Sequence, residues 1–445
     1  MRLLSQIFQP IITIPKGAKI KNTEITCKSQ KLLLECGLVR PTSAGFFTLL
    51  PLARRAITKL ENIIQRCLDD VGAQRITLPC LTTAKLWATS GRLDDVGPEL
   101  IKVVDRHGKK FLLAPTHEEA IADLLADVGP VSYKQLPLIL YQIGNKYRDE
   151  HRPKHGLLRA REFNMMDAYS AHISHECAAK TYNALTDAYH RIFRTLDAPV
   201  CRVEAPTGEM GGSLSHEWQL PAPAGEDALA VCPSCSHTAL ASDNNTCVKC
   251  GKETERVNSI EVGHTFVLGT RYSEPLQANF VGPDSSAPIY MGCYGIGITR
   301  LLAAILEVMS SEKAMRWPTE IAPYTAVVIG PKEGSKEWSQ HDFNKVQEVA
   351  RHIDDSGFRD DVVVDDRHTL TIGKRLMMAD RTGYPYIVVC GRSALETPPR
   401  YELYRSTRGE ALPPQLFTLD ELINVMRENK INIDVEYIEN VNRAK

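Results

Sequence analysis

Several features that would place this chain in a specialised class are missing from its sequence. No run approaches about 18 consecutive apolar residues, so no membrane-spanning helix and no membrane partner are expected. Neither sign of charge is in excess, because 53 Lys and Arg face 54 Asp and Glu. Bulk charge therefore does not indicate a nucleic-acid partner, and any basic surface must be local. Internal repeats and low-complexity tracts are also absent.

A Walker-type nucleotide loop is missing too. The pattern GxxxxGK[ST] occurs nowhere, which excludes ATP use through a P-loop. Tyr294-Gly-Ile-Gly297 has the first two glycines of a dinucleotide fingerprint, but Arg300 stands at the third position. Because that side chain would block the close approach of helix and strand, a Rossmann nucleotide site is rejected.

The composition that is present belongs to an ordinary globular protein of more than one domain. The chain has 445 residues, of which 43% are hydrophobic and 24% charged. A chain of this length can bury a sizeable core, and two or three domains are expected. It does not need disulfides for stability, so most of its 12 cysteines are expected to be buried thiols in a reducing compartment.

The amino terminus has the character of an organellar targeting segment. The first 23 residues contain no Asp or Glu but four Lys or Arg, and apolar residues recur at helical spacing from Leu3 to Ile12. We expect residues 1–27 to be a transit peptide or an N-terminal arm, and Pro10 and Pro15 count against a long helix there.

The front half of the chain predicts an antiparallel sheet with helices. A helix is expected from Pro51 to Val71, with proline at its first position, and another over 299–309. Residues 111–125 indicate a strand entering a helix, with Thr116 as the N-cap and Glu119 at the third helical position. Further strands are predicted at 74–78, 138–143, 261–268 and 289–291.

A domain boundary is predicted near residues 316–323, where Pro318 and Pro323 flank a short segment. Beyond it, strand-like and helical stretches alternate, which predicts a small α/β domain with a largely parallel sheet. The strands are expected at 326–329, 362–364 and 386–389, and the helices at 341–356 and 370–382.

The stretch from Lys146 to Phe163 is the densest basic segment of the chain, with six Lys or Arg and two His against three acids. Guanidinium groups suit phosphate oxygens, so Arg148 is a candidate anion ligand. Glu150 would lie on the same side of a strand as Arg148, and Phe163 offers a flat face for a base. The alternative is a solvated, charged hairpin without a ligand.

Three motifs in order resemble the class II aminoacyl-tRNA synthetases. Arg148-x-Glu150, the basic loop and Arg161-Glu-Phe163 resemble motif 2, and Gly295-Ile-Gly297-Ile-Thr-Arg300 opening an apolar helix resembles motif 3. The long helix followed by a strand that ends at Pro79 resembles motif 1, the dimer element of that class.

Longer segments narrow the resemblance to the prolyl-tRNA synthetases of the bacterial and organellar type, over about residues 28–409. These segments are Ala114–Glu119, Arg161–Tyr169, Gly263–Ser273 and Met291–Tyr294. The resemblance implies an α+β catalytic domain, an antiparallel sheet flanked by helices, at 28–320. A small α/β anticodon-binding domain with a C-terminal extension would follow at 321–445.

The resemblance also implies roles for single residues, taken over by motif position. Arg148 would touch both the ATP α-phosphate and the proline carboxylate, and Arg300 would hold the γ-phosphate; both are the expected catalytic residues. Glu150 would belong to the ATP site and Phe163 would stack on adenine. The expected proline pocket comprises Thr116, Glu118, Arg148, Met165, Asp167 and Tyr169, with His216 and Cys293 as less certain neighbours.

This set makes chemical sense because prolinium is a cation, which the carboxylates of Glu118 and Asp167 would balance. The alternative for Thr116 and Glu118 is an ordinary helix N-terminus. The implied reaction uses ATP as substrate and Mg²⁺, forms prolyl-adenylate and passes proline to tRNA(Pro), with the 3′ hydroxyl as acceptor. A homodimer and a place in the mitochondrial matrix are also implied.

The chain departs from the bacterial relatives where these carry a large editing domain. Only 33 residues, 228–260, separate Asp227 from Glu261, so hydrolysis of mischarged Ala-tRNA by this chain is not expected. They contain Cys232-x2-Cys235 and Cys247-x2-Cys250, which indicate a structural Zn²⁺ site with four sulfur ligands. The alternative is a vestigial loop whose thiols stay reduced and empty or pair as a disulfide.

In the C-terminal domain, Val364-Asp365-Asp366-Arg367 followed by Gly373-Lys374-Arg375 resembles the family's anticodon-contacting edge. Asp365 and Arg367 are the candidate base readers. No role follows for residues 410–445 beyond a helical piece at 419–428.

Two other functions fit parts of the sequence. A synthetase-like accessory subunit without chemistry would be expected to have lost the arginines of motifs 2 and 3, yet Arg148 and Arg300 are present. A zinc-ribbon nucleic-acid protein would explain only the cysteine segment and is rejected.

Overall fold

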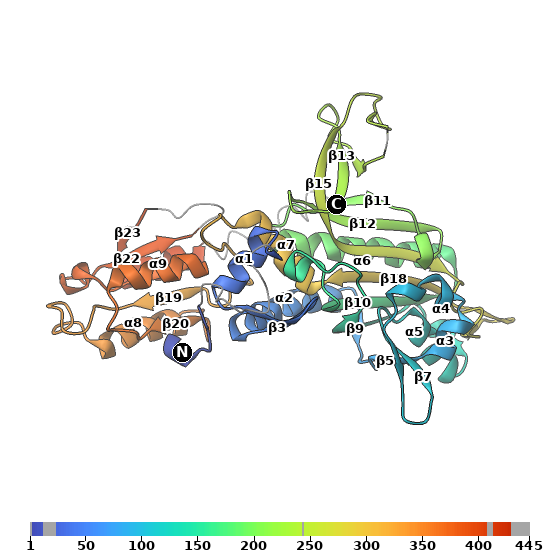
Figure 1. Cartoon of the computed structure of the whole chain (residues 1–445), viewed down its shortest axis with the longest axis horizontal. Coiled ribbons are helices and arrows are strands. Elements are labelled where there is room, and N and C mark those ends of the chain that lie inside the picture. The colour runs from blue at the N-terminus through green and yellow to red at the C-terminus, as the bar shows by residue number, and fades with distance from the viewer. Residues whose placement is uncertain (1, 12–23, 243, 407–412, 429–445) are drawn as a thin grey trace.

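The chain folds into two parts, each built on its own sheet, in a computed structural model that describes residues 2–11, 24–242, 244–406 and 413–428. Figure 1 shows the larger part on the right, the smaller on the left, and a narrow arm that projects from the larger part between strands β13 (Asp227–Val231) and β15 (Glu255–Gly269).

The larger part is organised by a sheet whose main path runs β11-β12-β15-β18-β10-β9-β4. All neighbouring pairs on this path are antiparallel except β4 with β9, which is parallel. The strands not yet bounded are β4 (Gln74–Arg75), β9 (Leu138–Tyr147), β10 (Glu162–His172), β11 (Cys201–Glu204), β12 (Leu214–Pro221) and β18 (Tyr290–Gly297). This arrangement confirms the predicted antiparallel sheet.

Three long helices pack against this sheet: α2 (Pro51–Asp69), α6 (His175–Thr195) and α7 (Ile298–Met309). Their apolar faces are buried, for example through Leu60 of α2, Ile192 of α6 and Leu302 of α7, each 0% exposed. The helices predicted at 51–71 and 299–309 are thereby confirmed. Because these helices occupy one face of the sheet, the other face is left for ligands.

Shorter elements complete the larger part. They are α1 (Lys28–Glu35), α3 (Ala84–Thr89), α4 (Arg92–Asp95), α5 (Glu118–Asp127), β2 (Val39–Ser43), β3 (Phe46–Leu49), β5 (Leu81–Thr83), β6 (Lys102–Val104), β7 (Lys110–Leu113), β8 (Val131–Ser132), β14 (Thr238–Leu240), β16 (Asn279–Val281) and β17 (Ser286–Pro288).

The start of α5 corrects one prediction. The helix begins at Glu118, its N-cap is His117, and no side chain caps it. Thr116 was expected to be the N-cap, but its hydroxyl donates to the Glu118 carboxylate, with an Oγ1–Oε2 distance of 2.6 Å. The hydroxyl therefore serves a side chain of the site rather than the helix backbone.

The smaller part has a six-stranded sheet of order β1-β20-β19-β21-β22-β23. The pairs β1–β20, β20–β19 and β19–β21 are parallel, as predicted for this domain, and the last two pairs are antiparallel. Its elements are β1 (Arg2–Leu3), β19 (Ala326–Ile329), α8 (Phe343–Asp355), β20 (Val362–Asp365), α9 (Ile372–Thr382), β21 (Tyr386–Val389), β22 (Tyr401–Arg405) and β23 (Gln415–Phe417). The two sheets together confirm the predicted fold class.

The described residues of the amino terminus are part of this fold. Arg2 and Leu3 form an edge strand beside β20, Leu4 is 7% exposed, and the Ser5 backbone N–H donates to Asp366 at 2.9 Å. Pro10 accepts a hydrogen bond of 2.6 Å from the Arg40 guanidinium of the larger part. Residues 12–23, which contain most of the predicted basic charge, lie outside the described residues.

The two parts share one continuous apolar core, in which Leu301 of α7 and Val327 of β19 belong to the same cluster. Polar contacts cross the same boundary: Lys59 of α2 donates to the Asp361 carboxylate at 2.6 Å. The relative position of the sheets is therefore held by packing and by charge.

Within the described ranges, no helix has the length and apolar content that crossing a bilayer requires. Residues 419–428 are helical, as predicted, and bury Leu422 and Met426 against the smaller part. The predicted C-terminal extension otherwise falls largely on residues 407–412 and 429–445, outside the described residues.

Candidate active site

One face of the sheet carries a row of side chains that the sequence predicted to act together. In a strand, alternate residues point to the same side, so β10 presents Phe163, Met165, Asp167 and Tyr169 on one face. Arg148 follows two residues after Lys146 of β9, which pairs with Phe163. The site is therefore assembled by strand pairing, with α5 closing one side.

Glu118, at the start of α5, is the best-buried carboxylate of this face, with an exposed fraction of 0%. Its oxygens accept from the Thr116 hydroxyl and from the Cys293 thiol, the latter at 2.9 Å. The guanidinium of buried Arg92 lies 3.2 Å from Glu118 and 3.1 Å from Glu119. The structure thus brings Thr116, Glu118 and Cys293 together, as predicted.

Asp167 forms a second buried anion beside the first. The Lys146 ammonium lies 2.6 Å from it, and the Tyr169 hydroxyl donates to it at 2.8 Å. Burial alone raises the pKa of Asp167, but the His117 hydrogen bond and the Lys146 charge outweigh burial and lower it. Tyr169 in turn accepts from the His117 backbone N–H at 2.8 Å, which ties Asp167 to the start of α5. The partner Lys146 was not predicted to be part of the site.

Two arginines face the same space from different elements. The Arg148 guanidinium carbon lies 5.4 Å from the centre of the Phe163 ring. Arg300, in the first turn of α7, donates to the Leu158 and Glu261 carbonyls at 2.9 and 3.1 Å. Burial and then the neighbouring Arg300 lower the pKa of Arg148. Two cations held this close indicate a site made for a polyanion.

Glu150 lies at the entrance to the basic loop, where its carboxylate accepts from the Arg159 Nε at 2.9 Å. Burial alone raises the pKa of Glu150, but the hydrogen bond from Arg159 and the one from the Arg152 backbone lower it. Glu150 is therefore an anion near Arg148, but residues 148–150 follow the end of β9, so the two side chains are not aligned by a strand as predicted.

Next to Arg300 lies a cluster that sequence reasoning missed: Glu217, Glu261 and His264, whose ligand atoms lie within 4.8 Å of one another. Burial and then the nearby Glu261 raise the pKa of Glu217, as expected where two carboxylates share a site. Burial alone raises the pKa of Glu261, but His264, 3.0 Å away, and Arg300 outweigh it and lower it. Oxygen ligands suit Mg²⁺, so these carboxylates fit the expected cation.

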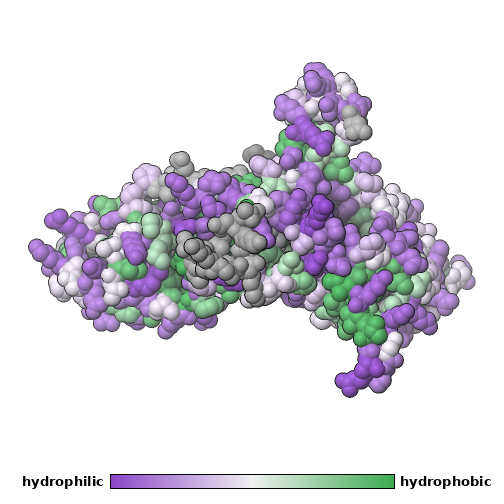
Figure 2. Space-filling view, in the orientation of Figure 1, coloured by the Kyte–Doolittle hydropathy of each residue, from purple (hydrophilic) through white to green (hydrophobic). Residues whose placement is uncertain are grey.

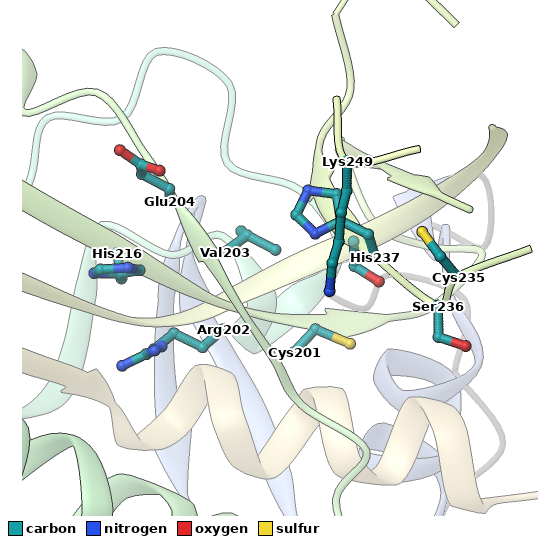
Figure 3. A pocket seen from close by; sticks show the side chains of 10 residues that line it. Cys201, Arg202, Val203, Glu204, His216, Cys235, Ser236, His237 and Lys249 are labelled. Atoms are coloured by element: carbon teal, nitrogen blue, oxygen red, sulfur yellow. The ribbon is translucent and has the colours of Figure 1, made fainter. Parts of the chain in front are cut away.

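His216 lies outside the expected proline pocket, which corrects a prediction. Its Nδ1 lies 2.7 Å from the Tyr182 hydroxyl of α6, on the helix-covered face of the sheet. Because neighbours along a strand point to opposite faces, Glu217 rather than His216 lies on the ligand face of the sheet. His216 instead lines a separate cavity of about 480 Å³ between β11 and the cysteine arm, together with Arg202, His237 and Lys249 (Figure 3).

The four cysteines of the arm converge. The Sγ atoms of Cys232 and Cys250 are 3.5 Å apart, and those of Cys235 and Cys247 are 3.7 Å apart. A tetrahedral zinc site with bonds of about 2.3 Å would separate its sulfurs by about 3.8 Å. The arrangement of these thiols therefore fits Zn²⁺.

Two matching turns hold these cysteines. The N–H of Ser236 donates to the Cys232 carbonyl at 2.9 Å, and the N–H of Gly251 donates to the Cys247 carbonyl at 2.8 Å. Both donors have a left-handed backbone, with φ of 57° and 72°. The two Cys-x2-Cys segments thus adopt the same turn. The cysteine spacing in the sequence was sufficient to predict that these two segments form one site.

The two candidate base readers of the smaller part have different roles. Asp365 is 0% exposed and accepts from the Arg367 guanidinium at 2.6 and 2.8 Å. A buried, fully paired carboxylate cannot reach a base edge, so Asp365 orients Arg367 instead. The side chain of Arg367 is 24% exposed and remains the candidate reader.

Comparison with known families places these features in context. Residues 101–309 match the tRNA synthetase class II core domain (G, H, P, S and T), and residues 325–429 match the anticodon binding domain. A solved structure, a Giardia lamblia prolyl-tRNA synthetase in complex with prolyl-adenylate, covers 89% of this chain and 75% of its own, with a TM-score of 0.75 at 20% identity. That likeness shows the fold.

Curated relatives are more similar in sequence. The chain is 43% identical over 422 residues to a probable mitochondrial proline–tRNA ligase of Homo sapiens, covering 92% of this chain and 88% of the relative. It is 35% identical to the corresponding protein of Schizosaccharomyces pombe, covering 84% and 88%. A proline–tRNA ligase of Ehrlichia chaffeensis is also 35% identical, covering 85% and 91%.

Proposed function

The chain belongs to the prolyl-tRNA synthetases, and on this premise we propose that it charges tRNA(Pro) with L-proline for mitochondrial protein synthesis, without editing. The observation that carries the catalytic part is the juxtaposition of two buried carboxylates with two arginines on one face of the sheet. The carboxylates suit prolinium and the arginines suit ATP.

The anionic end of the pocket would bind the amino group of proline. Glu118 and Asp167 lie on either side of Thr116 and Tyr169, whose hydroxyls donate to them. A prolinium placed here gains two buried charge partners, and hydrogen bonds to charged groups are stronger where burial lowers the local dielectric. The Cys293 thiol, buried against Glu118, would limit the space beside the ring.

The cationic end would bind ATP. The charge of Arg148 interacts with those of both Arg300 and Glu118, so this guanidinium can meet the proline carboxylate and the α-phosphate together while Arg300 holds the γ-phosphate. The carboxylate of proline then attacks phosphorus in line and pyrophosphate leaves. The protein supplies position and charge rather than a nucleophile. Mg²⁺ held by Glu217 and Glu261 would neutralise phosphate charge. Phe163 would lie against adenine.

The test of this assignment is Arg148→Ala, compared with Arg152→Ala in the same loop. Loss of a group that meets developing charge costs about 100-fold or more in rate. We expect proline-dependent ATP–pyrophosphate exchange to fall at least that far for Arg148→Ala and to stay within a few-fold for Arg152→Ala. Near-normal exchange by folded Arg148→Ala would exclude the assigned role.

The absence of editing is proposed from the size of the arm. The 33 residues at 228–260 contain most of β13, all of β14, the cysteine turns and the start of β15, which leaves no room for a hydrolytic domain. Mischarged Ala-tRNA(Pro) should therefore remain acylated when the enzyme is added. Enzyme-dependent deacylation would contradict this.

The mitochondrial matrix is proposed from the relatives together with the acid-free amino terminus. The contacts of residues 2–10 with both parts suggest that this targeting segment is retained after import rather than removed near residue 27. Amino-terminal sequencing of the protein isolated from mitochondria decides the point, and a first residue near 28 would disprove retention.

A homodimer is proposed from the motif 1 resemblance and from the surface beside it. Figure 2 shows hydrophobic surface gathered around β5, β9 and α5, and Leu81 of β5 is 46% exposed. Ile76 and Leu78, just before it, are half-buried. A second copy of this chain would cover this surface, and light scattering that gives the mass of one chain would contradict the proposal.

A further inference from the structure

The cysteine arm is fixed to the sheet at its root, which is the connection between β12 and β13. Residues 222–226 connect β12 to β13, and the Ala222 N–H donates to the Asn258 carbonyl of β15 at 2.9 Å. At Gly225 the chain passes so close to β15 that an added Cβ would overlap the Ser259 carbonyl. The next residue, Glu226, is therefore presented from a rigid position.

The carboxylate of Glu226 contacts the basic loop between β9 and β10. One oxygen pairs with the Lys154 ammonium and the other with the Arg159 guanidinium, while the His155 Nε2 lies 4.0 Å away. One anion thus faces three nitrogen-bearing side chains of a single loop. Glu226 itself is 33% exposed, so water reaches the network and salt will screen it.

Arg159 carries this contact into the active site, because it also binds the Glu150 carboxylate at 2.9 Å. Glu150 lies two residues from Arg148. The chain of contacts therefore runs from the arm root through Glu226 and Arg159 to Glu150, at the edge of the ATP side of the site.

We propose that Glu226 is a positioning residue for adenylate formation, which holds the basic loop in its working arrangement before ATP binds. This inference rests on the proposed function of the site. Without the carboxylate, Lys154 would lose this ion pair and Arg159 would keep only its contact with Glu150, so the loop would leave the conformation seen here more often. ATP would then have to order the loop as it binds, and ordering each such side chain costs binding energy.

The kinetic consequence is specific. Glu226→Gln should raise the KM for ATP about five- to tenfold, because the ordering cost falls on ATP binding. The kcat should fall less than about threefold, since Arg148 and Arg300 are untouched. The KM for proline should not change, because Thr116 and Glu118 are held by other contacts.

The experiment compares wild type, Glu226→Gln, Glu226→Asp and Glu255→Gln in proline-dependent ATP–pyrophosphate exchange at low and high salt. Glu255 is an exposed acid of the same arm, so its variant controls for lost negative charge. The difference between wild type and Glu226→Gln should shrink at high salt, and Glu226→Asp should recover part of the loss.

A second readout does not depend on activity. Trypsin cleavage after Lys154 and Arg159 reports how often the loop opens, and it should be faster in Glu226→Gln without ligands and equal to wild type with saturating ATP and proline.

Equal KM for ATP and equal cleavage in wild type and Glu226→Gln would overturn the inference. So would a variant whose only change is tighter tRNA binding, since Glu226 would then merely mask cations. If the wild-type protein itself shows no exchange, the proposed function is wrong, and the exchange assay then says nothing about Glu226. Faster cleavage in the variant would still support the loop contact in that case.

Discussion

Single side chains in this site are held by partners that decide which of them can meet a ligand. Glu118 and Glu119 are adjacent, fully buried and bound by the same Arg92, yet only Glu118 also accepts from Thr116 and Cys293. Glu119 accepts instead from the Ser90 hydroxyl at 2.9 Å, away from the pocket. Separate substitutions of Glu118 and Glu119 therefore test whether Glu118 contacts prolinium.

We predict that Glu118→Gln raises the KM for proline by about 10- to 100-fold, because a hydrogen bond to a charged group contributes about 1.5–3 kcal/mol. Glu119→Gln removes the same charge from Arg92 and should leave the KM for proline within about threefold. Proline titrations of pyrophosphate exchange, with thermal unfolding as the folding control, decide this. A similar KM shift in both variants would show that loss of the Arg92 pairing, not contact with proline, is the cause.

The residues that sequence reasoning found and missed differ in one respect. Arg148, Glu150 and Arg300 stand in local motifs, so the resemblance to the class II synthetases was enough to single them out. Lys146, Glu217 and Glu226 act through partners that strand pairing brings from far along the chain. The error at His216 has the same origin, since one residue of register along β12 decides which face a side chain takes.

Among the elements, the cysteine arm has two parts that are expected to serve different purposes, a group of thiols and a root fixed to the sheet. Its four thiols lie at the tip side, whereas Gly225 and Glu226 are fixed to β15 at the root. A metal at the thiols would hold the two turns together without reaching the site.

We predict about one Zn²⁺ per chain, released by a strong chelator or by Cys250→Ser. Metal loss should make the arm sensitive to protease while proline-dependent exchange stays within about threefold, because the root does not depend on the turns. Elemental analysis, limited proteolysis and exchange measure the three quantities. No metal in native protein, with four freely reactive thiols, would rule out the site.

Elements were predicted well where apolar periodicity was long, as in α2 and α7, or where short apolar runs lay between helices, as in β19 and β21. Strand β10 was not predicted, and strands β9 and β18 run beyond the predicted segments because residues 144–147 and 292–297 continue their pairing with β10. Strand β1 could not be predicted, since its partner, β20, lies about 360 residues away.

At the scale of the whole molecule, Asp361 connects the two parts. Its carboxylate accepts from Lys59 and Arg55 of α2 and from the Thr325 hydroxyl. The helix that resembles the dimer element is thereby tied to the first two strands of the anticodon-binding part.

We predict that Asp361→Asn destabilises the protein by about 1–2 kcal/mol, because the carboxylate is 21% exposed and its ion pairs with Lys59 and Arg55 are lost. The kcat/KM for tRNA charging should fall more than proline-dependent exchange, which needs only the larger part. Thermal unfolding and the two assays measure this. The control Asp360→Asn changes a neighbouring side chain and should behave as wild type; equal losses in both assays would contradict the coupling role.

The proposed function begins with the activation of proline. The most direct measurement is ATP–pyrophosphate exchange by purified protein with each of the twenty amino acids in turn. The arrangement of Glu118, Asp167 and the two arginines predicts exchange with proline, and at most weak exchange with alanine or cysteine. A folded protein that binds tRNA but shows no exchange with any amino acid would contradict the account and favour an accessory RNA-binding subunit.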